Sequence, residues 1–209
     1  MMSAPATLES GLAIEWGVAS RALAGQSISG DVSAIVRTAN GVVVAAVDGL
    51  GHGSEAAVAA GIAAETLKAH AEEPLPDIIR RCHEALRRTR GVAISIASFD
   101  VRHSTMTWTG IGNVDGALYR AAASALPQRE ALLLRGGVVG YSLPQPRVAT
   151  LSVAPGDTLI FTTDGVAAGF RRGPVQGGSA QELADDILVR HGRELDDALV
   201  LAARYIGVS

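Results

Sequence analysis

The chain has 209 residues, a net charge of −3, a hydrophobic content of 48% and an aromatic content of only 4%. We therefore expect a single domain over residues 1–209, with an aliphatic core within about residues 12–206. The acidic balance argues against nucleic-acid and membrane partners, and the single cysteine excludes a disulfide framework or a Cys-rich zinc site. No signal-peptide pattern and no apolar run of about 20 residues is present, which predicts a cytoplasmic protein, and we expect a monomer.

The elements can be predicted in chain order. A strand is expected at 12–23, then a hairpin over 31–48 with Asn40-Gly41 as its turn. Alanine-rich residues 54–70 predict a helix with Gly53 or Ser54 as its N-cap. A second helix is indicated by a stripe of apolar residues at helical spacing: Leu75, Ile78, Ile79, Cys82 and Leu86. Six strands (92–99, 105–111, 115–120, 131–135, 147–153, 158–163), a helix (179–191) and a last strand (198–206) complete the prediction.

Two of these strands are apolar on both faces, namely "VVVAAV" at 42–47 and "ALVLAARYI" at 198–206. Such runs are typical of parallel sheets, but the short connections here predict antiparallel pairing. An antiparallel strand buried on both faces needs a second sheet on one side and helices on the other. We therefore predict an α+β fold, a four-layer α/β/β/α sandwich of two antiparallel sheets flanked by helices.

Four aspartates fall at the predicted strand ends. With Asn40-Gly41 as a two-residue loop, residue 33 faces Asp48, which makes Asp31 a diagonal neighbour of Asp48 on the same face. Asp164 follows one apolar strand and Asp196 begins the last one. Because the end of one antiparallel strand and the start of its neighbour share an edge, we expect all four side chains at one mouth. Asp196 and Asp197 diverge, so we expect only one of them to point into this mouth.

An oxygen-only cluster favours a hard divalent cation, Mg²⁺ or Mn²⁺. Taken singly, each aspartate is more often a turn residue, and Asp-Gly is an ordinary turn pair. A different possibility is a nucleotide-binding loop at "GLGHG" (49–53), although it matches no dinucleotide fingerprint and carries no Walker lysine. The glycines that follow Asp48 and Asp164 would let the backbone approach closely and turn a carbonyl toward a ligand.

The ordered motifs resemble the PPM family of metal-dependent protein serine/threonine phosphatases, and most of all its SpoIIE-type bacterial branch. They are "SGD" (29–31), "DGLGHG" (48–53), "GIGNV" (110–114), "TTDGV" (162–166) and "DDALVLAARY" (196–205). The resemblance implies the same sandwich and a site for two Mn²⁺ or Mg²⁺ ions. It implies that Asp48 bridges both ions and that the Gly49 carbonyl binds one. Asp164 and Asp196 would bind the other, and Asp31 would act directly or through water.

The resemblance also implies a reaction, in which a metal-activated water attacks the phosphorus of a phosphoprotein with no phosphoenzyme. With Asp48 at the metals, His52 could protonate the leaving oxygen, or it could be a loop residue packed against the helix that begins at residue 54. The implied substrates are phosphorylated STAS-domain proteins, either stressosome subunits or an anti-anti-sigma factor. Gly30 stands where eukaryotic relatives carry a glutamate ligand, which leaves open a degenerate phosphatase that binds a phosphoprotein without turnover.

Overall fold

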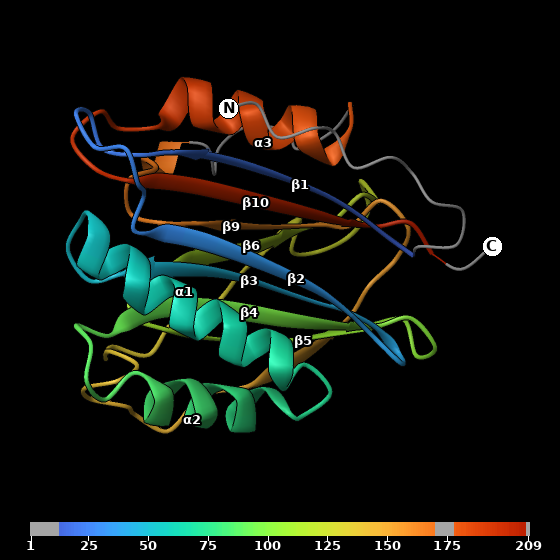
Figure 1. The fold of residues 1–209 in the computed structure, drawn as a ribbon. Helices are drawn as coiled ribbons and strands as arrows, with labels where there is room; N and C mark the ends of the chain where they lie inside the picture. The colour runs from blue at the N-terminus through green and yellow to red at the C-terminus, as the bar shows by residue number, and fades with distance from the viewer. Residues whose placement is uncertain (1–12, 170–177, 208–209) are drawn as a thin grey trace.

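The computed structural model describes residues 13–169 and 178–207, which form two antiparallel sheets and three helices (Figure 1). Residue 12, the first of the predicted strand 12–23 and of the predicted core, lies outside the described residues. The strands are β1 Ile14–Arg21, β2 Asp31–Thr38, β3 Gly41–Gly49, β4 Val92–Asp100, β5 Thr105–Ile111, β6 Asp115–Tyr119, β7 Arg129–Ala131, β8 Ala149–Ser152, β9 Thr158–Thr162 and β10 Ala198–Tyr205. The helices are α1 Ser54–Ala69, α2 Leu75–Ala85 and α3 Ala180–His191. In the described part of the chain, none of these helices combines the length and the apolar character needed to cross a bilayer.

The elements stack in four layers, as the sequence predicts. The first sheet has the strand order β1-β10-β9-β6-β7, and the second has the order β2-β3-β4-β5-β8. Helix α3 covers the outer face of the first sheet, while α1 and α2 cover the outer face of the second (Figure 1). The predicted α/β/β/α sandwich of antiparallel sheets is therefore confirmed.

The side chains of β3 and β10, the two strands that are apolar on both faces, point alternately into the core between the sheets and toward the helices. In β3, Val42, Val44 and Ala46 belong to the core between the sheets. The intervening residues of β3 pack under α1 and α2. In β10, Leu199 and Leu201 likewise face the second sheet, while the alternate residues face α3. Because side chains of a strand alternate between faces, a central strand of a four-layer sandwich must be apolar throughout.

The hairpin of β2 and β3 corrects one prediction. Thr38 pairs with Gly41, so the two turn residues are Ala39 and Asn40 rather than Asn40 and Gly41. Gly41 is a strand residue, and a Cβ there would lie 2.0 Å from the Phe99 carbonyl oxygen, so close packing against β4 requires the glycine. The resulting register differs from the predicted one by two residues. A shift of two keeps every side chain on its predicted face.

One further boundary differs from the prediction, and the predicted start of the first helix agrees with the structure. Residues 131–135 were expected to form a strand, but β7 ends at Ala131 and the chain then bridges from Arg135 to Ile111 of the other sheet. Helix α1 has Gly53 as its N-cap, with a φ of 79° and no side-chain cap. The apolar stripe of α2 is buried as predicted, and Cys82 lies within it.

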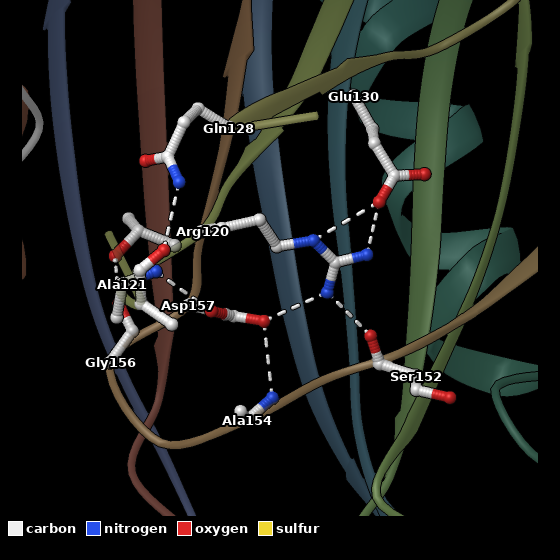
Figure 2. Close-up of polar contacts among 10 residues, drawn as sticks. Arg120, Ala121, Gln128, Glu130, Ser152, Ala154, Gly156 and Asp157 are labelled. Atoms are coloured by element: carbon white, nitrogen blue, oxygen red, sulfur yellow. Dashed lines mark hydrogen bonds and ion pairs between the residues drawn. The ribbon is translucent and has the colours of Figure 1, made fainter. Parts of the chain in front are cut away.

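A half-buried ion-pair network closes one end of the sandwich (Figure 2). Arg120 follows β6 and Asp157 precedes β9, and their side chains pair at 2.9 Å. Asp157 also accepts hydrogen bonds from the backbone N–H groups of Ala121 and Ala154, and Arg120 also contacts Glu130. Because β6 and β9 are antiparallel neighbours, their other ends, where the predicted site begins, lie at the opposite end of the sandwich.

Candidate metal centre

The four predicted aspartates lie at the same end of the two sheets. Asp31 begins β2 and faces Asp48, near the end of β3, as a direct cross-strand pair in the second sheet. In the first sheet, Asp164 follows β9 and Asp196 precedes β10, and these two strands are antiparallel neighbours. The predicted mouth is therefore present, and the diagonal relation of Asp31 and Asp48 is corrected to a directly opposed pair. Side chains in such pairs have Cβ atoms about 4.5–5.5 Å apart.

Strand alternation explains why these side chains meet between the sheets. Asp48 continues the series of even-numbered β3 residues that face the first sheet, and its partner Asp31 lies on the same face. In β9, Leu159 and Phe161 face the second sheet. Thr163 continues this series, and its Oγ1 donates a hydrogen bond of 2.7 Å to Asp31 Oδ2. The apolar core between the sheets thus ends in a polar mouth.

The electrostatics of the mouth are those of crowded carboxylates. Burial raises the pKa of Asp31 to about 7, assisted by the negative charges of Asp197, Asp164 and Asp196 and opposed by the Thr163 hydrogen bond. Burial, followed by the charge of Asp31, raises the pKa of Asp48 to about 8. Both shifts mean that the ionised forms are costly here unless a positive charge is added.

Asp196 and Asp197 divide two roles between them. Asp197 is buried, and its carboxylate accepts hydrogen bonds of 2.8 Å from the backbone N–H groups of Leu23 and Gly30. It therefore anchors the loop that leads into Asp31. Asp196 is half-buried and accepts a hydrogen bond from the Asp197 N–H. Burial and the charge of Asp164 raise the pKa of Asp196, which places Asp196 within the acidic cluster.

Asn113 adds a contact that the sequence did not predict. Its Nδ2 donates a hydrogen bond of 2.7 Å to Oδ2 of Asp164, whose side chain is exposed. The residue of the "GIGNV" motif that contacts the site is thus Asn113, through its neutral side-chain amide. The signal was its position just before β6, a neighbour of β9, since the start of one strand meets the end of the other.

The glycines beside the aspartates permit close backbone packing. A Cβ at Gly49 would lie 2.2 Å from the Ala56 carbonyl oxygen in α1, and a Cβ at Gly165 would lie 1.9 Å from the Asp197 carbonyl oxygen. At Gly30, a Cβ would lie 2.9 Å from the Ala56 Cβ and 3.1 Å from Asp197 Oδ2. A glutamate in place of Gly30 would therefore crowd both α1 and the Asp197 carboxylate.

His52 lies at the exposed rim of the mouth. Its Nδ1 is 3.2 Å from Gln26 Nε2, and its charge, when protonated, lowers the pKa of Asp196. The ring is thus fixed by the loop that precedes β2 and lies near the acidic cluster. Arg21, at the end of β1, is held by a hydrogen bond of 2.7 Å to the Arg193 carbonyl.

The donor set fits a hard divalent cation, because it offers carboxylate oxygens and because three of its carboxyl groups, those of Asp31, Asp48 and Asp196, have raised pKa values. Among residues 13–169 and 178–207, no three acidic, imidazole or thiol side chains lie close enough together to hold a metal ion as they stand.

Comparison with known proteins identifies the family. The model of the family described as stage II sporulation protein E (SpoIIE) matches residues 38–205. The chain belongs to the SpoIIE family. The resemblance predicted from the sequence motifs is confirmed, and with it the assignment to the protein phosphatases of the PPM type. The phosphoserine phosphatase RsbX of Bacillus subtilis strain 168 is 26% identical over 180 residues, which cover 83% of this chain and 85% of that protein.

Solved structures agree with this family fold. A chain from a structure described as the bacterial stressosome, a modular system adapted to control secondary messenger signalling, has a TM-score of 0.84 and 30% identity. The match covers 91% of this chain and 99% of that one. The crystal structure of RsbX in complex with magnesium has a TM-score of 0.82 at 23% identity, over 94% of this chain and 96% of that one. At that identity the likeness concerns the fold.

Proposed function

We propose that this protein is a divalent-metal-dependent phosphatase that hydrolyses phosphoserine or phosphothreonine in a protein substrate. The observation that carries the proposal is the meeting of four aspartates, two from each sheet, at one mouth where burial and mutual repulsion raise the pKa values of Asp31 and Asp48. The family, and the name of RsbX as a phosphoserine phosphatase, support the same chemistry.

The metal ligands in this proposal are Asp48 and the Gly49 carbonyl, with Asp164 and Asp196 from the first sheet and Asp31 directly or through water. When bound, two Mg²⁺ or Mn²⁺ ions would supply Lewis-acid polarisation of the phosphate and activation of the attacking water. The chain's own residues shape the rest. Asn113 orients Asp164, and Asp197 fixes the loop before Asp31, so the carboxylates present defined oxygens to the mouth.

The mouth is open enough for a phosphate carried by another protein, since both His52 and Asp164 are exposed. His52 would hold a proton for the departing serine or threonine oxygen, and its ring lies beside Gln26 at the rim of the mouth. The proposed substrates are phosphorylated STAS-domain proteins of a stressosome module, and phosphorylated anti-anti-sigma factors are the alternative. The RsbX relative and the stressosome chain at 30% identity support this choice of substrate. A cytoplasmic location is part of the same proposal.

Hydrolysis of p-nitrophenyl phosphate by the purified protein, with Mn²⁺, with Mg²⁺ and with EDTA, tests the chemistry. We expect metal-dependent turnover that falls at least about 100-fold in Asp48→Asn, because a ligand is lost. Asp186→Asn, which changes an exposed helix carboxylate paired with Arg190, is the matched control and keeps full activity. Equal turnover with EDTA and with metal, or full activity in Asp48→Asn, would contradict the proposal.

The role of His52 has its own signature. p-Nitrophenolate leaves without needing a proton, whereas a serine alkoxide does need one. We therefore expect His52→Gln to reduce kcat about 100-fold on a phosphoserine STAS protein and much less on p-nitrophenyl phosphate. An equal loss on both substrates would assign His52 to structure or to metal binding instead.

A binding protein without turnover is the second candidate, favoured by Gly30 in place of the glutamate ligand. Tight binding of a phosphorylated STAS protein without phosphate release, in the presence of Mn²⁺, would support it. Stabilisation by ATP but not by Mn²⁺ would instead favour the nucleotide-binding alternative.

A further inference from the structure

Thr163 is a buried residue at the junction of the two sheets, with 1% of its surface exposed. It follows β9 and extends the pairing of β9 with β10, because its N–H donates a hydrogen bond of 3.1 Å to the Leu199 carbonyl. Its side chain points to the second sheet, in the direction shared by Leu159 and Phe161. The Thr163 hydroxyl is thus a polar group of the first sheet that reaches Asp31 in the second.

When Asp31 is ionised, as it would be with a cation bound, the hydrogen bonds of this hydroxyl have one direction. Thr163 Oγ1 accepts a hydrogen bond of 2.9 Å from the Leu199 N–H, and an N–H group can only donate. A hydroxyl carries one proton, and the Asp31 carboxylate 2.7 Å away can accept it. The Leu199 N–H therefore donates a hydrogen bond to the Thr163 oxygen, and the Thr163 O–H donates one to Asp31 Oδ2.

The backbone around Asp31 is fixed independently. The Asp31 N–H donates a hydrogen bond of 3.0 Å to Ser29 Oγ, and the Gly30 N–H donates one of 2.8 Å to Asp197. These contacts fix where the Asp31 side chain starts but not how its carboxylate rotates. That rotation is set by the bond from Thr163.

We propose that Thr163 is a positioning residue that engages Asp31 Oδ2 and thereby leaves the other carboxylate oxygen of Asp31 to face a divalent cation in the mouth. This inference rests on the proposed function, because it assumes a cation at the four aspartates. It assigns no contact with substrate to Thr163. Hydrogen bonds to ligating carboxylates orient the ligand, and their loss typically weakens metal affinity about 10–100-fold.

The test is Mn²⁺ binding to the full-length protein, measured by isothermal titration calorimetry for Thr163→Val and Thr163→Ser. Valine keeps the shape but removes the hydroxyl, and serine keeps the hydroxyl. We expect Thr163→Val to weaken Mn²⁺ binding about 10–100-fold and Thr163→Ser to bind close to wild type. Thr109→Val is the matched control, because Thr109 is fully buried and its hydroxyl has no hydrogen-bond partner among the described residues.

A second measurement separates positioning from general damage. In an Asp31→Asn background, Thr163→Val should cause little further loss of Mn²⁺ affinity, because Thr163 acts through the Asp31 carboxylate. Circular dichroism and thermal unfolding without metal check the fold of each variant. Should Thr163→Val fail to fold, Thr163→Ala removes the same hydroxyl with a smaller side chain and takes its place.

Three results would each overturn the positioning role. The first is that folded Thr163→Val binds Mn²⁺ as tightly as the wild type, and the second is that Thr163→Ser loses as much Mn²⁺ affinity as Thr163→Val. The third is that Thr163→Val loses its full share of Mn²⁺ affinity even in the Asp31→Asn background. Absence of Mn²⁺ binding in the wild type would overturn it as well. Wild-type protein that binds Mn²⁺ but hydrolyses no phosphate ester would refute the proposed function alone. In that case the comparison of the two Thr163 variants still decides the positioning role.

Discussion

Raising the pH should destabilise the metal-free protein, because Asp31 and Asp48 keep protons in the folded state that the unfolded chain releases. The pKa of Asp48 rises from its ordinary value of 3.8 to about 8, and that of Asp31 rises to about 7. Between the ordinary and the raised value the folded state binds more protons, so the free energy of unfolding falls as pH rises. Each such group contributes a slope of about 1.4 kcal/mol per pH unit.

Asp48→Asn isolates one of these groups, since asparagine resembles a protonated aspartate that cannot ionise. We expect the variant to match the wild type in stability in EDTA only below about pH 4, where the aspartate is protonated in the folded and the unfolded chain alike. Between about pH 5 and pH 7.5 the difference should grow in favour of the variant by about 3 kcal/mol, from the slope of one group over this interval. Saturating Mn²⁺ should reverse the order, because bound metal stabilises the wild type and loses a ligand in the variant.

Urea unfolding at the two pH values, with EDTA and with Mn²⁺, measures these differences. Asp186→Asn is the control, because this exposed carboxylate should change stability by less than about 1 kcal/mol at either pH. A difference between wild type and Asp48→Asn that does not grow with pH would refute the reasoning, since ionisation of Asp48 would then carry no folding cost.

Three further predictions concern the scaffold. Gly49→Ala should destabilise the protein by about 1–3 kcal/mol in urea unfolding and weaken Mn²⁺ binding, because the new Cβ would collide with the Ala56 carbonyl oxygen. The control is Gly61→Ala on α1, where a Cβ would meet no atom within 4 Å. This variant should be more stable than the wild type by about 0.5–1 kcal/mol. Arg120→Met should cost about 3–5 kcal/mol in the same measurement, because buried Asp157 keeps its backbone N–H donors but loses its cationic partner. The kcat per folded molecule should not change. Arg190→Met on the surface should cost less than about 1 kcal/mol, and equal costs for the two variants would contradict a role of burial in the Arg120–Asp157 pair. Burial raises the pKa of the Cys82 thiol to about 12, so Ellman's reagent should detect no thiol in the folded protein at about pH 8 and one equivalent in urea; rapid reaction of the native protein would contradict this burial.

Much of the fold and the gathering of the four aspartates at one end of the sheets could be predicted from local patterns. The double apolar character of 42–47 and 198–206 predicts a layer on each side of the central strands, and the structure has both layers. The mouth follows from strand direction alone, because antiparallel neighbours start and end at one edge. A register wrong by two residues still placed Asp31 and Asp48 on one face, since alternation has a period of two.

The sequence by itself therefore determined the layers, the central strands and the end of the sandwich at which the four aspartates gather, because periodicity and strand direction are local properties. Only the tertiary structure decided which polar groups touch them. Asp197 anchors Gly30, Asn113 reaches Asp164, and Thr163 crosses from one sheet to the other to bond Asp31. These contacts join residues as much as 167 positions apart in the chain. They depend on how two separately formed sheets stack, which no local pattern encodes.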